Sequence, residues 1–275
     1  MTARPVRLGG VRQAVLVLVV ACRGDSRATP SVDSARGAPA VATRAEATPA
    51  TWRVVSWEPY AGVDPADLGV GVAFLTHAED KGAPAGTDTL LLRSAPNDAS
   101  PPIGAMLFTV GANGITQYAV TAADSLRPNL VEHGYEESGV PFDSSDASGR
   151  WVRGILGFTA DSTARVGWID TGRRGIGVIR WAQQLADRPI YFPRPEAAAF
   201  FARPDSSQRV VTPRGGRDAY AIHPVGVRGP WLRVNVVMPS DNCEADSAPR
   251  RTRTLWIRYL DDRGRPNVWY YSRGC

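Results

Sequence analysis

The feature that most constrains the fold of this chain is an internal repeat of short segments that contain tryptophan. Residues 168–175 align with residues 256–263, both beginning Trp-Ile, and a further tryptophan follows at the same spacing in each copy. Upstream, residues 149–153 (Gly-Arg-Trp-Val-Arg) match residues 229–233 (Gly-Pro-Trp-Leu-Arg). The same order of elements occurs twice, which predicts two structurally related modules.

Side-chain character alternates along these segments as it does in β-strands. Residues 151–155 and residues 232–236 both show the period of two that is typical of a half-buried strand. Only residues 182–186 and 196–201 are candidates for short helices, because prolines close to them prevent longer ones. The sequence therefore predicts an all-β fold.

One extra hairpin distinguishes the first copy. Residues 107–110 and 115–120 are apolar, β-branched runs on either side of Asn113-Gly114, a pair that tolerates the positive φ of a tight turn. Together with composition, the repeat predicts five parts of the chain: a signal peptide 1–21, a disordered tether 22–51, a first module 52–181 with an N-terminal extension and this hairpin, a linker 182–197 and a second module 198–275.

The N-terminus predicts an export signal. Three arginines precede an apolar run that ends in Ala21-Cys22, and this pattern resembles bacterial lipoprotein signals. The resemblance implies that Cys22 is lipidated and that the protein is anchored to a membrane of the cell envelope. An ordinary cleaved secretory signal is the alternative. A transmembrane helix is excluded for this run, because crossing a bilayer takes roughly 20 apolar residues.

Charge and composition bear on partners. The net charge is +5, but Arg4, Arg7 and Arg12 lie in the signal, which contains no acidic residue, so the processed chain would carry about +2. This balance does not predict nucleic-acid binding, and a phosphate-binding role would require arginines clustered on one face of the fold. Residues 22–51 are rich in Ala, Thr, Pro, Ser and Arg and have no aromatic residue, which predicts a flexible tether.

Beyond Cys22 the chain has two cysteines, Cys243 and Cys275. An even pair in an exported protein is best interpreted as a disulfide, because that compartment is oxidising. Two free thiols or a redox site are the alternatives, although no Cys-x-x-Cys spacing supports them.

At its repeated segments the chain resembles the bacterial SH3-like modules, which are small β-barrels. The residues that carry the resemblance are Arg93-Ser94-Ala95-Pro96, Gly149-Arg150-Trp151-Val152-Arg153 and Gly167-Trp168-Ile169. The second copy departs from the pattern, since Leu255 stands where the last glycine would be. The resemblance implies two small SH3-like barrels and a non-catalytic role in binding peptidoglycan, a peptide or another envelope protein.

Catalytic motifs are scarce. The three histidines, His77, His133 and His223, lack zinc-ligand spacing, and there is no Gly-x-Ser-x-Gly elbow, so we expect no metal and no cofactor. Carboxylates around His133 leave an envelope hydrolase as the alternative function. Residues 143–149 could hold calcium, but a polar turn is the better interpretation, because the sequence lacks the final Glu of a calcium loop.

A ligand surface is predicted near the C-terminus. Tyr270 and Tyr271 point to opposite faces of a strand, so some of these rings would reach solvent. We expect Arg258, Tyr259, Tyr270 and Tyr271 to line a site where a sugar or peptide stacks. The alternative is that the rings pack between the two modules.

Overall fold

The computed structural model describes residues 49, 51–57, 68–76, 86–111, 116–210, 213, 219–242 and 249–271. All of them belong to one compact unit, Arg44–Cys275. The predictions for the signal peptide 1–21, for lipidation of Cys22, for nearly all of the tether 22–51 and for the Cys243–Cys275 disulfide therefore lie outside the described residues.

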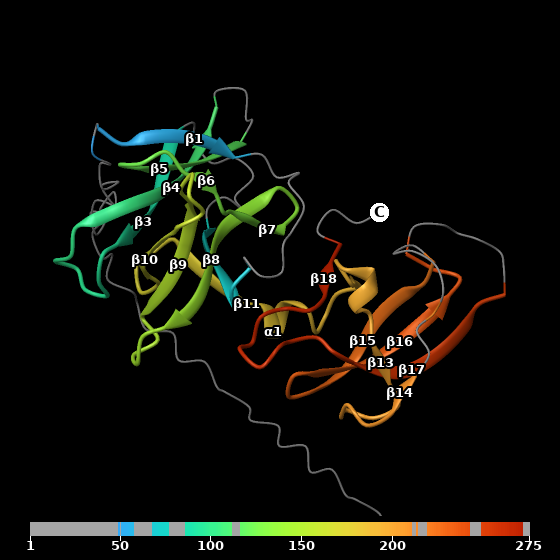
Figure 1. The fold of residues 1–275 in the computed structure, drawn as a ribbon. Helices are drawn as coiled ribbons and strands as arrows, with labels where there is room; N and C mark the ends of the chain where they lie inside the picture. The colour runs from blue at the N-terminus through green and yellow to red at the C-terminus, as the bar shows by residue number, and fades with distance from the viewer. Residues whose placement is uncertain are drawn as a thin grey trace, which may run out of the picture. The chain divides into compact units, whose positions relative to one another are not determined.

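The described chain folds into two antiparallel sheets, which confirms the all-β prediction (Figure 1). We call the part that forms the first sheet the first half and the part that forms the second sheet the second half. The first sheet contains β1 (Arg53–Trp57), β2 (Gly71–Leu75), β3 (Gly86–Arg93), β4 (Pro102–Val110), β5 (Thr116–Ala122), β6 (Arg127–Pro128), β7 (Val131–Gly134), β8 (Glu137–Ser145), β9 (Trp151–Phe158), β10 (Ala164–Asp170) and β11 (Ile176–Arg180).

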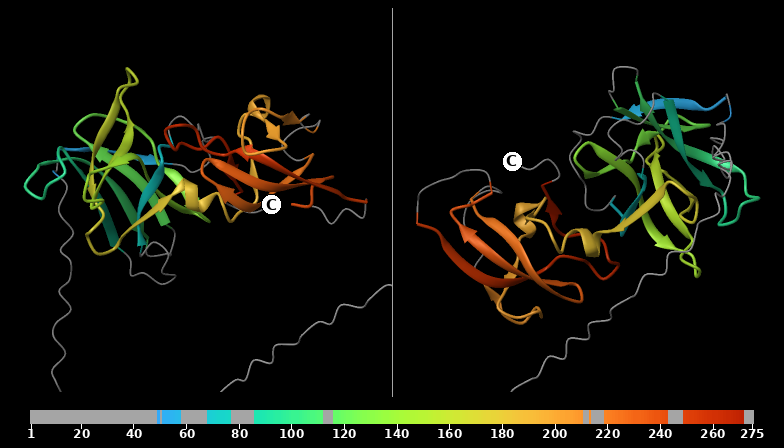
Figure 2. Two further views of the ribbon diagram at one scale, coloured as in Figure 1. Left: turned by 90° about the horizontal axis from the view of Figure 1, so that it is seen from below. Right: turned by 180° about the vertical axis from the view of Figure 1, so that it is seen from behind.

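The second sheet is smaller, and Figure 2 shows its orange strands from two further sides. A short helix α1 (Trp181–Gln184) follows the first sheet, and a 3-10 turn η3 (Pro195–Ala197) lies within the second half. The strands of the second sheet are β12 (Ile190–Tyr191), β13 (Phe200–Phe201), β14 (Arg209–Val210), β15 (Ala221–Arg228), β16 (Trp231–Met238), β17 (Arg251–Arg258) and β18 (Trp269–Tyr270).

Six strands have the same order in both sheets. The first sheet contains the order β3-β10-β9-β8-β2-β11, and the second contains β13-β17-β16-β15-β12-β18. Corresponding strands also follow one another along the chain in the same sequence. Strands β1 and β4–β7 are additional in the first half, and β14 is additional in the second. This correspondence is the arrangement that the sequence repeat predicts.

The two halves also share the details of the hairpin that starts with the repeated tryptophan. Trp151 pairs with Asp170 across β9 and β10, and Trp231 pairs with Arg258 across β16 and β17. In each half a bulge interrupts the preceding strand pair, β8 with β9 and β15 with β16. Gly149 and Gly229, two residues before these tryptophans, have φ of 74° and 55°, a conformation that favours glycine.

Several local predictions are resolved by these elements. Strands β4 and β5 pair from Gly104 to Val110, so the predicted inserted hairpin is confirmed, although its Asn-Gly turn lies outside the described residues. The predicted linker 182–197 contains β12, which pairs with β15 and β18, so the second sheet begins before residue 198. The prediction of a helix over residues 196–201 is wrong. The 3-10 turn η3 ends at Ala197, and Phe200–Phe201 form the strand β13.

The halves are joined through buried aromatic residues. The Trp181 side chain is fully buried, its Nε1 donates a hydrogen bond to the Leu68 carbonyl at 2.7 Å, and its ring lies 4.8 Å from the ring of Trp269. The hydroxyl of Tyr270 donates to the Glu132 carbonyl at 3.0 Å. One hydrophobic cluster therefore includes Trp181 with residues from both sheets, while a second cluster fills the first half alone.

Candidate functional site

The predicted aromatic strip does not form a surface. Tyr259 and Tyr270 are 2% and 1% exposed, so the prediction that they line an open ligand site is wrong. Their hydroxyls donate to the Ala182 and Glu132 carbonyls, which places both rings in the joint between the halves. Tyr271 is partly exposed and lies against Tyr191, with ring centroids 4.8 Å apart. Tyr259 and Tyr270 therefore fit the alternative prediction, in which these rings pack between the two modules.

Of the four predicted residues, Arg258 lines a groove in the second half. This second-half groove has a volume of about 380 Å³, and its walls include the side chains of Phe192, Arg194, Phe201, Trp231, Arg258 and Arg265. Trp231 begins β16 and Arg258 ends β17, so strand pairing sets them side by side. The Trp231 and Phe201 rings meet edge to face at 5.2 Å, and both are only partly buried.

Positive charge dominates the lining of the second-half groove. Arg194, Arg258 and Arg265 stand against one lining carboxylate, Asp261. Arg265 donates to Asp261 at 2.7 Å. Burial alone would raise the pKa of Asp261, but hydrogen bonds from Arg265 and from the Arg263 backbone lower it below its usual value. Asp261 is therefore ionised, and its carboxylate already forms an ion pair with Arg265.

Arg258 forms its ion pair outside the groove lining, with Asp262, whereas Arg265 pairs with the lining residue Asp261. The Nη2 of Arg258 forms this ion pair, and the side chain of Asp262 is 91% exposed. The Nε of Arg258 is buried and has no hydrogen-bond partner among the described residues. The Arg258 side chain as a whole is 36% exposed, so its guanidinium can donate to an anionic group that enters the groove.

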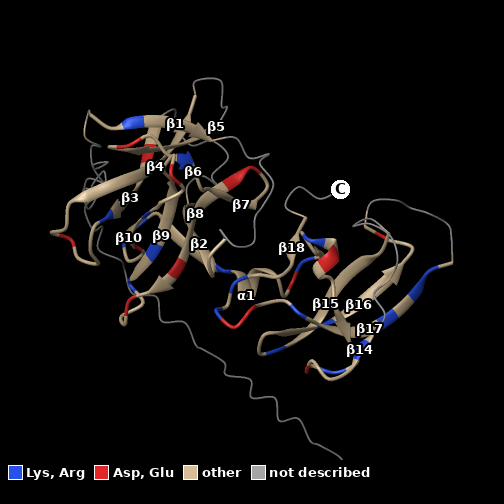
Figure 3. Cartoon of the chain, in the orientation of Figure 1, with Lys and Arg blue, Asp and Glu red and all other residues tan. Residues whose placement is uncertain are grey.

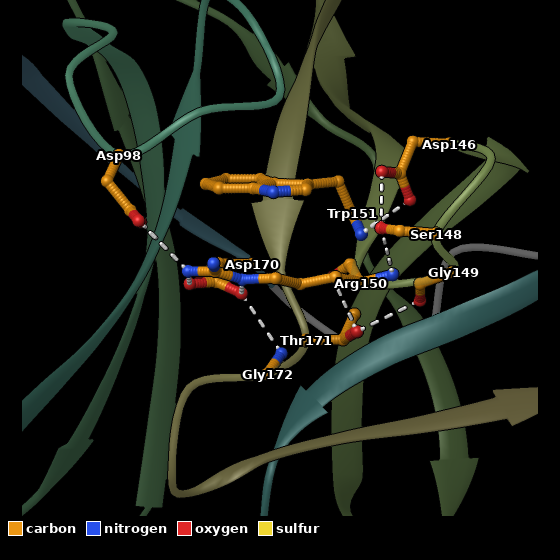
Figure 4. Close-up of polar contacts among 9 residues, drawn as sticks. All are labelled: Asp98, Asp146, Ser148, Gly149, Arg150, Trp151, Asp170, Thr171 and Gly172. Atoms are coloured by element: carbon orange, nitrogen blue, oxygen red, sulfur yellow. Dashed lines mark hydrogen bonds and ion pairs between the residues drawn. The ribbon is translucent and has the colours of Figure 1, made fainter.

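The first half has a cavity at the matching place, and there the chain itself supplies both charges (Figure 4). Arg150 donates from Nε and Nη2 to Asp170 at 2.8 and 2.7 Å, and Nη2 also reaches Asp98 at 3.0 Å. The guanidinium lies 5.3 Å from the centroid of the Trp151 ring. The cavity, about 290 Å³, is lined by Asp98 and Asp170, which bind Arg150, and also by Arg93 and Arg173.

Hydrogen bonds also fix the turn that carries Arg150. Asp146 accepts from the Ser148 hydroxyl at 2.6 Å and from the Trp151 backbone at 3.0 Å. These bonds lower the pKa of Asp146, so it stays ionised. Residues 143–145 end the strand β8, and residues 146–149 form the polar turn that follows it. Among the described residues, no group of three His, Cys, Asp or Glu side chains could hold a metal ion.

The alternative hydrolase depends on His133, and that side chain is buried. It is 3% exposed, and its ring lies 4.2 Å from the ring of Phe74. Burial, aided by the nearby charge of Arg188, lowers the pKa of His133 to about 4. Glu132 Oε1 accepts from the Glu136 backbone at 2.9 Å. A buried, neutral imidazole does not present an acid or base to substrate, so no observation favours this alternative.

Comparison of the chain with protein-family models, with curated proteins and with solved structures finds no match. Within the described ranges, no helix has the length and apolar character needed to span a membrane. The candidate site therefore depends on the geometry of the second-half groove and on its contrast with the first half.

Proposed function

We propose that this chain is a non-catalytic binding protein of the cell envelope, anchored by lipid on Cys22, and that its second-half groove binds the peptide stems of peptidoglycan. One observation carries the proposal: at equivalent places the first-half cavity is lined by Asp98 and Asp170, which bind Arg150, whereas the second-half groove is lined by Trp231, Phe201 and Arg258.

The groove has the composition of a binding site. Partly exposed Trp and Arg side chains contribute most to binding energy at protein surfaces, because they combine large contact area with directional hydrogen bonds. Trp231 and Phe201 can pack against the backbone of an extended peptide, while the arginines attract its carboxylates. This proposal keeps the predicted partner and moves the site from Tyr259 and Tyr270 to the groove.

Replacing Trp231 with alanine is expected to weaken binding to isolated peptidoglycan about tenfold, which corresponds to about 1.4 kcal/mol. Sedimentation of the purified domain with peptidoglycan measures the change. Tyr135→Ala is the matched control, because Tyr135 is 65% exposed and lies in the first half, so its loss should leave retention unchanged. Equal retention of the Trp231→Ala variant and the parent protein would contradict the proposal that the second-half groove binds peptidoglycan.

The SH3-like assignment is part of this proposal. It is supported by the motifs in both copies and by the equivalent order of six strands in the two sheets. In such modules the role is binding, which agrees with a groove lined by aromatic and basic side chains. We propose no cofactor and no nucleic-acid partner.

The proposed location at a membrane of the cell envelope depends on the N-terminal export signal alone. Replacing Cys22 with alanine is expected to move the protein from the membrane fraction to the soluble fraction, or to leave an unprocessed precursor, since the acceptor thiol is lost. Cell fractionation with immunodetection measures this. Unchanged processing and membrane partitioning would show that another feature anchors the chain.

A further inference from the structure

We propose that the second-half groove recognises a free carboxylate of its peptide ligand, and that the Arg258 guanidinium binds this group. The inference rests on the proposed function, because it names the chemical group that the groove selects. The first half already contains an arginine bound to a carboxylate at the equivalent place, Arg150 with Asp170.

The comparison begins with the residue opposite the repeated tryptophan. In the first half this residue is Asp170, and Arg150, directly before Trp151, binds it with two hydrogen bonds. In the second half the residue opposite Trp231 is Arg258, and a proline precedes that tryptophan. The second half thus has an arginine at the place where the first half has the carboxylate of Asp170.

The present partner of Arg258 is a weak competitor. Asp262 is 91% exposed and lies four residues along the chain, and surface ion pairs of this kind contribute little free energy. Asp262 engages Nη2, while the buried Nε stays without a partner among the described residues. The Arg258 side chain is 36% exposed, so a ligand carboxylate can displace Asp262 and bind the guanidinium, as Asp170 binds Arg150.

The remaining charges favour the same ligand. Arg194 and Arg265 line the groove with Arg258, and the one lining carboxylate, Asp261, is bound by Arg265. The groove therefore attracts an anion more strongly than a neutral amide. A terminal carboxylate differs from a terminal amide in charge and in its ability to accept hydrogen bonds from a guanidinium with both oxygens.

The test compares two probes that differ only at this group: an acetylated tripeptide ending in D-Ala-D-Ala with a free carboxylate, and the same tripeptide as its carboxamide. Calorimetric titration of the purified domain measures both dissociation constants. We expect the carboxylate to bind at least tenfold more tightly than the carboxamide. Arg258→Gln should abolish this preference, and Asp262→Asn should increase affinity for the carboxylate several-fold by removing the competitor.

Arg253→Gln is the matched control, because Arg253 is an exposed arginine in the basic stretch of β17 (Figure 3) that does not line the groove. It should leave both affinities unchanged. Equal binding of the two probes, lost in Trp231→Ala, would overturn the carboxylate inference and leave the proposed function standing. Failure of both probes to bind the parent protein, or binding unaffected by Trp231→Ala, would overturn both. If Arg258→Gln does not fold, Asp262→Asn provides the test. A several-fold gain in affinity for the carboxylate probe supports the inference, and an unchanged affinity contradicts it.

Discussion

Replacing Trp181 with alanine is expected to lower the free energy of unfolding by about 3 to 5 kcal/mol, because a large buried side chain is removed and a cavity remains. The Trp181 ring is fully buried, contacts Trp269 and donates to the Leu68 carbonyl, so it ties the second half to the first. Urea denaturation followed by circular dichroism measures the loss.

Two variants separate the contributions of Trp181. Trp181→Phe retains much of the apolar volume but leaves the Leu68 carbonyl without its donor, so an intermediate loss of about 1 to 3 kcal/mol is expected. Tyr135→Ala, at an exposed aromatic position, should change stability by less than about 0.5 kcal/mol. A Trp181→Ala variant as stable as the Tyr135→Ala variant would show that the joint contributes no stability.

Lowering the pH from 7.5 to 5 is expected to cost about 2 kcal/mol of stability through His133 alone. The folded pKa is lowered to about 4, first by burial and then by Arg188, whereas an unfolded histidine has its ordinary value near 6.5. In this window the unfolded chain takes up a proton that the folded chain excludes. Stability from this group is therefore complete above pH 6.5 and decreases as the pH falls toward 4.

The comparison for this effect is His133→Gln, which cannot titrate. Urea denaturation at both pH values gives the change in unfolding free energy for each protein, and carboxylates contribute equally to both. The variant should lose about 2 kcal/mol less than the parent between pH 7.5 and 5. An identical pH dependence in the two proteins would contradict a neutral, buried His133.

The repeated part of the fold could be predicted from the sequence because its signals are local. Alternation and the Gly-x-Trp motif predict strands that begin at Trp151 and Trp231, and these become β9 and β16. Strand β12 has only two residues, too few to show alternation, so its segment was interpreted as a linker. Its pairing depends on distant strands, β15 and β18.

The site was harder to predict, because alternation shows which side chains share a face but not what covers that face. Tyr270 is covered by the first half through Glu132, and Arg188 lies over its ring at 5.1 Å. The sequence pattern does not distinguish Trp231 from the buried Trp151 and Trp181, yet Trp231 lines the groove. A usable signal was present in the repeat: Asp170 and Arg258 occupy equivalent positions with opposite charge.

The most direct test of the central claim is a nuclear magnetic resonance titration of the ¹⁵N-labelled domain with the carboxylate tripeptide. The account predicts shifts of the Trp231 indole N–H and of the Arg258 guanidinium, with the Trp151 indole and the Arg150 guanidinium unchanged, because Asp98 and Asp170 already bind Arg150. Shifts confined to Trp151 and Arg150, or no shift in the second-half groove at saturating peptide, would contradict it.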